Sequence, residues 1–342
     1  MSSCATSSIK NNILETIGNT PLVRLSRVFQ HLPLHVFAKL EAHNPGGSIK
    51  DRPALNIIKS GIESGIISPE TVVIESSSGN FGVGLAQACE YYGLQFICVV
   101  DPKTPAQTKS ILKAYGAKIE LVSAPDPVTG EYLQVRLNRV GELLQSIPNS
   151  FWPNQYASLD NPAAHHQTMH EIMAALDWRV DYLFCATSTC GTLRGCTEFV
   201  RKHKLVTQII AVDAIGSVIF GCASATRLIP GHGAGVRPAL YRPDLADRCV
   251  HVSDLDCVVG CRRLLQGEAI LAGGSSGAII SSVEKLKDEL TPNANCVLIL
   301  PDRGDRYLET IYFDSWVKAH FGDITHLWQR ERKKSAWVTV TF

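Results

Sequence analysis

The sequence lacks the charge imbalance that marks proteins binding nucleic acid or anionic membranes. Its 342 residues carry 33 Lys and Arg against 32 Asp and Glu, which gives a formal net charge of +1. Binding to the phosphates of nucleic acid or lipid needs a concentrated positive surface, and no basic stripe is present. We therefore expect neither a nucleic acid nor a membrane as a partner.

Long apolar runs and closely spaced cysteine pairs are also missing. No stretch approaches the ~20 apolar residues of a membrane-spanning helix, and residues 1–10 lack the apolar core of a signal peptide. The 11 cysteines form no CxxC pair, which argues against a zinc site or a thioredoxin-like centre. Most stand within apolar segments, so we expect buried, reduced thiols in a cytoplasmic protein.

The sequence contains instead a regular alternation of strand-like and helix-like segments. Apolar runs typical of buried strands cover residues 72–75, 96–100, 118–122, 182–187, 208–213 and 296–301. Helical patterns lie between most of them, and this alternation is typical of parallel sheets covered by helices on both faces. The expected fold class is therefore α/β, in a chain long enough for two lobes.

One lysine stands directly before a predicted helix. A Pro-Gly-Gly turn at residues 45–47 precedes Lys50, and the helix is predicted to begin at Asp51. The positive end of a helix dipole disfavours a charged ammonium group and so lowers its pKa. Because free amines form Schiff bases, Lys50 is a candidate covalent anchor for pyridoxal 5'-phosphate (PLP). The alternative is an ordinary surface lysine after a loop.

Polar loops at two later strand ends suit a ligand that carries a carboxylate and a phosphate. The turn formed by Ser77, Ser78 and Gly79 offers amides and hydroxyls to an amino-acid carboxylate, and Asn80 follows with an amide for a ring oxygen. Residues 187–192 offer four hydroxyls before a predicted helix, which suits a phosphate. No nucleotide P-loop or GxGxxG pattern is present. Both loops are also compatible with ordinary helix N-caps.

A third loop places Ser275 at the start of another predicted helix. A serine there would face a pyridine nitrogen as a neutral partner. An unprotonated ring withdraws electrons less strongly, so loss of a β-leaving group competes well with transamination. The alternative role of Ser275 is an N-cap.

Taken in order, these motifs resemble those of the cysteine synthase and cystathionine β-synthase family. The matching segments are residues 17–23 (IGNTPLV), 44–52 (NPGGSIKDR), 78–80 (SGN), 154–155 (NQ), 274–277 (GSSG) and 300–307 (LPDRGDRY), within a match from about 13 to about 313. The resemblance implies fold-type II of the PLP enzymes, which is tryptophan synthase β-like, with two three-layer αβα lobes and mainly parallel sheets. It also implies a larger PLP-binding lobe of residues 1–44 and 148–342, a smaller mobile lobe of residues 45–147, and a homodimer.

The same resemblance implies roles for individual residues. Lys50 carries PLP and acts as acid and base, Asn80 meets the ring hydroxyl oxygen, and Ser275 meets the ring nitrogen. The residues that hold the phosphate are Ser188, Thr189, Cys190, Gly191 and Thr192. The residues at the substrate carboxylate are Ser77, Ser78 and Gln155, with Gly79 and Phe81 beside them.

Departures from the family pattern point to one branch. Phe81 replaces a threonine of the usual carboxylate loop, and Ser188 and Cys190 replace glycines of the phosphate loop. Together with residues 211–220 and 229–235, they resemble the branch that joins O-phospho-L-serine and L-glutamate to N-(2-amino-2-carboxyethyl)-L-glutamate and releases phosphate. That product is a precursor of 2,3-diaminopropionate for siderophores of the staphyloferrin B type and for related natural products.

The leaving phosphate of such a reaction carries close to two negative charges, which suits an arginine. Our candidate is Arg136, within the amphipathic stretch 131–144, with Tyr156 and Ser188 as neutral helpers. The alternative for Arg136 is a solvated helix face beside Glu131 or Glu142.

L-Glutamate brings two further carboxylates to the site. The candidate partners are Arg237, Arg303 and Arg306, and the sequence does not decide among them. Two other functions stay open. One is a cysteine synthase using O-acetyl- or O-phospho-L-serine with sulfide, and the other is a non-enzymatic binding protein, against which the complete set of cofactor motifs argues.

Two remaining features receive weaker interpretations. The spacing of His165, His166 and His170 would place them on one helix face, where polar surface or a subunit contact is more common than metal binding, so we expect no metal. Residues 336–342 alternate weakly and are a candidate edge strand or dimer contact.

Overall fold

The structure is a computed structural model that describes residues 9–127 and 130–329. Its strands are β1 (Leu22–Arg24), β2 (His35–Leu40), β3 (Val72–Ser76), β4 (Gln95–Val100), β5 (Lys118–Leu121), β6 (Ser150–Phe151), β7 (Tyr182–Ala186), β8 (Gln208–Ala214), β9 (Arg248–Val252) and β10 (Asn295–Leu300). Its α-helices are α1 (Asp51–Glu63), α2 (Asn80–Tyr92), α3 (Ala106–Ala114), α4 (Leu133–Ser146), α5 (Asp160–Ala175), α6 (Gly191–Lys202), α7 (Asp254–Glu268), α8 (Gly274–Leu286) and α9 (Asp314–Phe321). Short 3-10 helices are η1 (Ile13–Thr16), η2 (Glu41–His43), η3 (Gly304–Tyr307) and η4 (Thr325–Leu327). The candidate edge strand at residues 336–342 lies outside the described residues.

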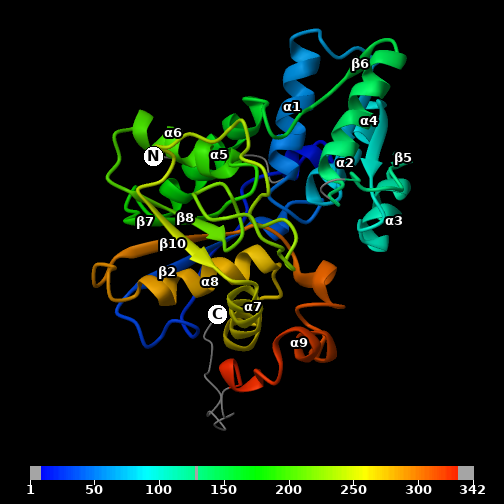
Figure 1. Cartoon of the computed structure of the whole chain (residues 1–342). Coiled ribbons are helices and arrows are strands. Elements are labelled where there is room, and N and C mark those ends of the chain that lie inside the picture. Colours follow the sequence, from blue (N-terminus) through cyan, green and yellow to red (C-terminus); the bar gives the residue numbers. More distant parts are fainter. Residues whose placement is uncertain (1–8, 128–129, 330–342) are drawn as a thin grey trace, which may run out of the picture.

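Two separate sheets organise the chain (Figure 1). The larger has the strand order β1-β2-β10-β7-β8-β9, and the smaller has the order β5-β4-β3-β6. Neighbouring strands run parallel in both sheets, except that β1 is antiparallel to β2. The predicted α/β fold with mainly parallel sheets is confirmed.

The central strand of the larger sheet shows why its residues are apolar on both faces. Along β10, Val297 and Ile299 join the core beneath α5 and α6, whereas Leu298 and Leu300 join the core beneath α7 and α8. Because successive side chains of a strand point to opposite faces, a strand covered on both sides needs a continuous apolar run.

Within the described residues, no helix is long and apolar enough to span a membrane.

A second core belongs to the smaller sheet. It joins α1 and α2 to β4, and Ile57, Ile58, Leu85 and Phe96 are each at most 4% exposed. In Figure 1, α1 to α4 surround this sheet in the upper right of the view. Helix α1 also touches the other lobe, since Asn56 Nδ2 donates to the Asp160 carbonyl of α5 at 2.8 Å. The lobe boundaries at residues 45 and 147, and the mobility of the smaller lobe, stay predictions.

A buried network of four charges fixes the first turn of α1. The Arg52 guanidinium contacts Glu41 and Glu171 at 2.7 Å each, and Lys39 Nζ contacts Glu171 at 2.7 Å. These side chains are at most 6% exposed, and their formal charges sum to zero. Isolated buried charges are costly, so each member needs the others. The network therefore joins β2, η2, α1 and α5 in one arrangement.

The charge of Glu171 is maintained by its arginine partner. Burial acts to raise the pKa of Glu171, but hydrogen bonds from Arg52 outweigh it and lower that pKa to about 2. The carboxylate thus stays ionised at any pH well above 2. Removing its charge would leave Lys39 and Arg52 with one carboxylate between them.

We expect Glu171→Gln to lower the free energy of unfolding by about 3–5 kcal/mol at neutral pH, because two buried cations lose a counter-charge. The folded pKa lies below the ordinary value of 4.5, so the contribution is complete above pH 4.5 and is lost as the pH falls toward 2. The difference between variant and wild type should therefore narrow in that window. Urea unfolding followed by circular dichroism at several pH values measures this difference in the free energy of unfolding.

The matched control is Glu63→Gln, which makes the same chemical change in the exposed pair Lys59–Glu63 at 3.6 Å. Exposed pairs of this kind contribute little, and we expect a change within about 0.5 kcal/mol. Equal losses in the two variants would show that the buried network has no special role.

Candidate active site

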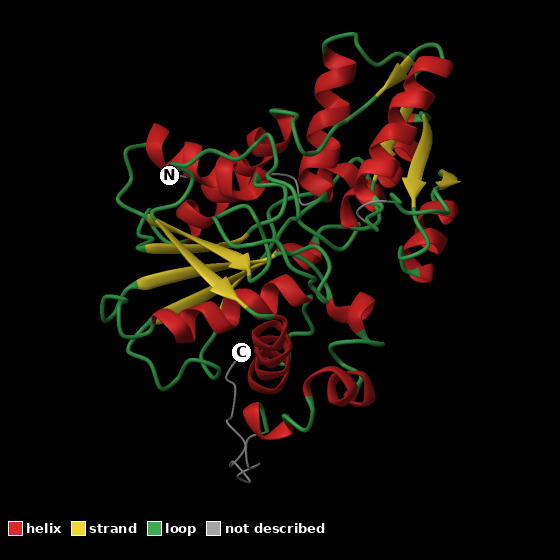
Figure 2. Ribbon diagram, viewed as in Figure 1, coloured by secondary structure: helices red, strands yellow, loops and turns green. Residues whose placement is uncertain are grey.

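The loops that carry the predicted site residues meet between the two sheets. Strands β3, β7, β8 and β10 end at Ser76, Ala186, Ala214 and Leu300. Figure 2 shows the loops crowded in the middle of the molecule, between the two groups of strands. In open parallel sheets, ligands bind beyond the carboxyl ends of the strands. The arrangement therefore places the site at this edge.

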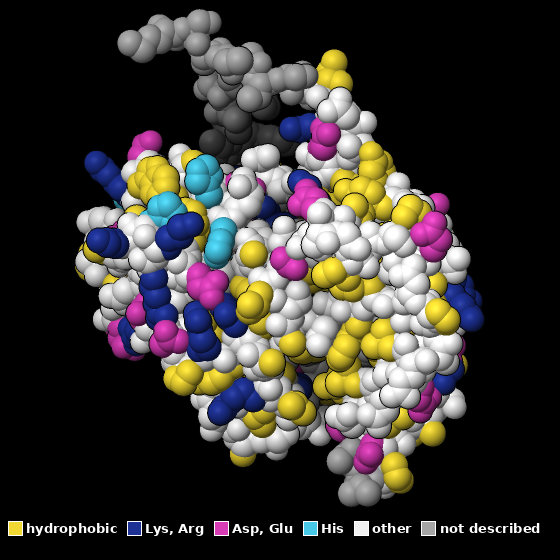
Figure 3. Space-filling model, turned by 90° about the horizontal axis from the view of Figure 1, so that it is seen from above, with side chains coloured by type: hydrophobic (Ala, Val, Ile, Leu, Met, Phe, Trp, Pro, Cys, Tyr) yellow, Lys and Arg dark blue, Asp and Glu magenta, His cyan; other side chains and the backbone are white. Residues whose placement is uncertain are grey.

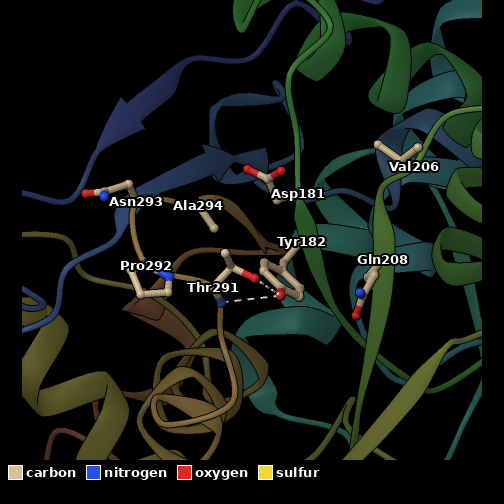
Figure 4. A pocket seen from close by; sticks show the side chains of 8 residues that line it. All are labelled: Asp181, Tyr182, Val206, Gln208, Thr291, Pro292, Asn293 and Ala294. Carbon is tan, nitrogen blue, oxygen red and sulfur yellow. Dashed lines mark hydrogen bonds between the residues drawn. The ribbon is translucent and has the colours of Figure 1, made fainter.

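A cavity at the opposite edge does not compete with this location. It has a volume of about 260 Å³ and lies at the amino ends of β7 and β8 (Figure 4). Tyr182 and Thr291 line it and share a hydrogen bond of 3.0 Å between their hydroxyls. Its lining includes no lysine, so it offers no amine that could form a Schiff base with PLP.

Lys50 stands immediately before α1, where the sequence predicts it. Its loop is held against the end of β10, because Ile49 N donates to the Pro301 carbonyl at 2.8 Å and Ser48 forms an isolated bridge with Asp302. Burial lowers the pKa of Lys50. The direction agrees with the prediction from the helix dipole, but the leading cause is burial. The result is an amine biased toward its neutral, nucleophilic form.

Asn80 begins α2 and reaches across to the larger lobe. Its Nδ2 donates to Asp302 Oδ2 at 2.8 Å, and the Tyr307 hydroxyl donates to the same oxygen at 3.0 Å. The Asn80 Oδ1 is buried without a partner in the described part of the chain. Burial raises the pKa of Asp302. Sequence reasoning did not single out Asp302, although the motif at residues 300–307 contains it.

The loop before α2 serves partly as a cap. Ser77 Oγ accepts a hydrogen bond from Gly82 N at 2.8 Å, so Ser77 binds an amide in the first turn of α2 although the N-cap residue itself is Gly79. A hydroxyl that accepts still has its own proton to donate, and Ser77 keeps that capacity for a carboxylate. Ser78 and Gly79 are half-buried, and nothing lies within 4 Å of a Cβ built at Gly79. The loop therefore offers room beside its backbone.

One predicted substrate residue is turned away from this loop. Phe81 is 2% exposed and packs in the core of the smaller lobe with Leu85 and Phe96. Its side chain thus faces the core, and the place of Phe81 beside the substrate stays a prediction. The reason is local: Phe81 is the second residue of α2, and that side of the helix faces the sheet.

A buried carboxyl group ties the carboxylate loop to Gln155. Glu75 accepts hydrogen bonds from Ser76 N at 2.8 Å, Trp152 Nε1 at 3.1 Å and Gln155 N at 3.3 Å. Burial raises the pKa of Glu75 to about 7. Sequence reasoning missed this residue. In the sequence, the only indication of Glu75 is that an acidic residue stands at the end of an apolar strand.

The predicted phosphate loop has a strained backbone at Cys190. This residue precedes α6 with φ 65° and ψ 1°, the left-handed conformation that glycine adopts most easily. The next residue has to be glycine, because a Cβ at Gly191 would lie 2.1 Å from Asn161 Oδ1. Thr189 Oγ1 accepts from Gly191 N at 3.3 Å and from Asn161 Nδ2 at 3.4 Å. The start of α5 thus fixes the loop before α6.

His165 also supports this loop, and our expectation for the three histidines of α5 is wrong in its case. His165 is fully buried, its Nε2 lies 3.2 Å from Thr192 Oγ1, and burial lowers its pKa. The other two lie nearer the surface: His166 pairs with Glu198 at 3.5 Å, and His170 packs edge-on against Trp178. Figure 3 shows histidine side chains beside Lys and Arg on this face.

Ser275 lies in the first turn of α8 and is 8% exposed. Its hydroxyl forms no hydrogen bond with the described residues. The helix is held close to α7, since a Cβ at Gly277 would lie 2.0 Å from the Cys257 carbonyl. The Ser275 hydroxyl therefore stands at a rigid position and is free to bind a ligand.

Arg136 is buried, and the alternative of a solvated helix face is wrong. It is 11% exposed, and its Nε lies 3.3 Å from Asp101 Oδ2. The ion pair leaves the buried Nε and Nη1 of Arg136 without a hydrogen bond to the described residues. Burial raises the pKa of Tyr156, and the charge of Arg136 opposes that rise, which places the two side chains near each other. Arg136 thus has N–H donors available for a ligand.

Comparison with known proteins agrees with this geometry. Residues 13–302 match the family described as pyridoxal-phosphate dependent enzyme. The chain belongs to this family. It is an enzyme of the β-replacement type, and its cofactor is PLP.

Relatives of this PLP enzyme include several synthases. The chain is 45% identical over 310 residues to N-(2-amino-2-carboxyethyl)-L-glutamate synthase of Ralstonia nicotianae, which covers 90% of this chain and 91% of that protein. Cysteine synthase of Entamoeba histolytica matches with a TM-score of 0.84 at 32% identity, over 92% and 94% of the two chains. O-ureido-L-serine synthase matches with a TM-score of 0.83 at 28% identity, over 90% and 96%. The predicted resemblance is confirmed.

The residues present suit PLP. The turn at Cys190 directs backbone N–H groups at the start of α6, an arrangement that binds phosphate. Asn80 Oδ1 has no protein partner among the described residues, and the Ser275 hydroxyl is likewise free for a polar ring atom. Lys50 lies next to Asp302, within the same group of loops. The individual contacts with PLP stay predictions.

We expect Cys190→Val to weaken PLP binding about tenfold. A β-branched residue fits the left-handed conformation poorly, at a cost of about 1–2 kcal/mol, and the phosphate loop would have to shift. Cys190→Gly is the matched control: it accepts this conformation, and its PLP affinity should stay within about threefold of wild type. Titration of the apoenzyme followed by cofactor absorbance measures both. Equal affinities would show that the backbone at residue 190 is not constrained.

Proposed function

We propose that this PLP enzyme joins O-phospho-L-serine and L-glutamate to give N-(2-amino-2-carboxyethyl)-L-glutamate and phosphate. The product would be a precursor of 2,3-diaminopropionate for siderophores or related natural products. The relative from Ralstonia nicotianae, named for this product, supports the proposal. The expectations of a homodimer and of a cytoplasmic location stay predictions.

The observation that carries the choice of first substrate is the state of Arg136. A phosphate monoester has almost two negative charges, and a guanidinium binds it through parallel N–H donors. Arg136 is held by Asp101 but has buried donors without partners. The acetyl ester of O-acetyl-L-serine is uncharged and releases a singly charged acetate, so it gains less from this cation. The pairing with Asp101 keeps the arginine in place until phosphate arrives.

The chain's own residues suggest how the reaction proceeds. The substrate carboxylate binds the turn at Ser77 and Ser78, and its phosphate binds Arg136. Bound PLP supplies the electron withdrawal that makes loss of the α-proton feasible. Lys50 takes that proton while the bond between the β-carbon and the phosphate oxygen breaks, and later returns it. The glutamate amine forms the new bond to the β-carbon.

A product assay tests the proposal directly. The PLP-loaded protein is given O-phospho-L-serine with either L-glutamate or sulfide, and products are identified by mass spectrometry. We expect a glutamate adduct together with free phosphate. The control variant Lys50→Ala should give neither. Cysteine as the sole product would identify a cysteine synthase instead, the activity named for the Entamoeba structure.

We also expect Arg136→Ala to reduce kcat/KM for O-phospho-L-serine by about tenfold to a hundredfold, since hydrogen bonds to charged groups contribute about 1.5–3 kcal/mol. Use of O-acetyl-L-serine as the donor should change by less than about threefold. Steady-state assays of phosphate and acetate release measure the two donors. Equal losses would mean that Arg136 only supports the fold.

A further inference from the structure

Both steps of the proposed reaction take place at one atom, the β-carbon of O-phospho-L-serine. Phosphate leaves the β-carbon of O-phospho-L-serine, and the glutamate amine then attacks that carbon. The residues that receive glutamate should therefore lie on the side of the site that holds the leaving phosphate. The sequence offered Arg237, Arg303 and Arg306 for this role, and their positions now distinguish them.

Two of these arginines lie on the side of Ser275. Arg303 forms an isolated bridge with Ala272, and its Nε lies 3.3 Å from Asp305 Oδ1. Arg306 Nη2 approaches the Gly46 carbonyl at 3.4 Å. Both arginines are thus held around the Pro-Gly-Gly turn and the end of β10, although Arg306 Nη1 is buried without a partner among the described residues.

Arg237 lies in a segment whose two ends are bonded to the phosphate side. At one end, Gly233 N donates to the Thr187 carbonyl at 2.8 Å, directly before Ser188. At the other end, Leu240 N donates to the Tyr156 carbonyl at 3.2 Å. Residues 233–240 therefore run between the two neutral helpers that the sequence assigned to the leaving phosphate.

The guanidinium of Arg237 is held without an acidic partner. It lies over the Tyr241 ring at 4.8 Å from the centroid, and its Nη2 donates to the Val218 carbonyl at 3.4 Å. The Tyr241 ring is itself packed edge-on against Phe220 at 5.5 Å. Arg237 is exposed, and no carboxylate of the described residues lies within ion-pair distance. An oriented arginine with free donors suits a carboxylate.

We propose that Arg237 binds the distal carboxylate of the glutamate substrate and so selects an amino dicarboxylate as the nucleophile. This inference rests on the proposed function. The attacking amine has to reach the buried β-carbon, whereas Arg237 is exposed at the rim. The carboxylate farthest from the amine is the group that spans this separation. Arg237 only binds and orients glutamate, and the distal carboxylate of glutamate is not altered by the reaction.

The test compares L-glutamate with L-glutamine, which has the same length and lacks the distal charge. We expect Arg237→Ala to raise KM for L-glutamate about tenfold to a hundredfold, with KM for O-phospho-L-serine within about threefold of wild type. Any use of L-glutamine should be unaffected. Arg237→Lys keeps the charge and loses the planar fork, so it should restore part of the affinity.

Two controls complete the experiment. Arg303→Ala removes one of the two rejected candidates, and Arg201→Ala removes an exposed arginine near the end of α6 that pairs with Asp244. Both should leave KM for L-glutamate within about threefold of wild type. The inference is overturned if Arg303→Ala raises that KM instead, or if Arg237→Ala impairs glutamate and glutamine equally. Absence of any glutamate adduct from the wild type removes the proposed function, and this inference with it.

Discussion

The location of the reactive lysine depends on four buried charges that never touch the substrate. Arg52 is the second residue of α1 and follows Lys50 by two residues, so the ion pairs of Arg52 with Glu41 and Glu171 determine where α1 begins and how it is rotated. Apolar residues of similar volume would pack at least as favourably, but they would tolerate sliding and rotation. Directional ion pairs do not tolerate such movement. Burying these charges costs free energy, but it fixes the position of the amine, which PLP chemistry requires.

The parts of the fold that could be predicted are those whose signal is local. Strands covered on both faces are continuous apolar runs, and β3, β4, β7, β8 and β10 were found within a residue or two of their predicted positions, as was the edge strand β5. The remaining strands break that pattern for physical reasons. Strand β2 contains Lys39, whose charge is acceptable only because Glu171 lies opposite. Strand β9 mixes Arg248 and His251 with apolar residues, and β6 has two residues.

The same distinction applies to the site. Loops that bind a ligand through their own backbone leave a local signature, and Lys50 and Asn80 were proposed from it, with roles that stay predictions. Glu75 and His165 act through partners 80 and 27 residues away, Gln155 and Thr192, so no spacing in the sequence reveals them. Phe81 shows a second limit of sequence reasoning, because membership of a motif does not say which way a helical side chain points. That direction depends on the face of α2 that packs on the sheet.

In the proposed reaction, substrate choice depends on how two cations, Arg136 and Arg237, are kept available. An arginine inside the protein needs a counter-charge, and Arg136 has Asp101. An incoming phosphate must therefore compete with a carboxylate already present, which a group with almost two charges does better than one with a single charge or none. Arg237 stands in solvent, where an aromatic ring and one carbonyl orient it without neutralising it. Water screens that charge, so its preference for a carboxylate comes from the geometry of the planar fork. In the proposed reaction, a cation with its own counter-charge binds the leaving group and an exposed, oriented cation binds the nucleophile, so a chain whose net charge is close to zero can hold two anionic substrates separately.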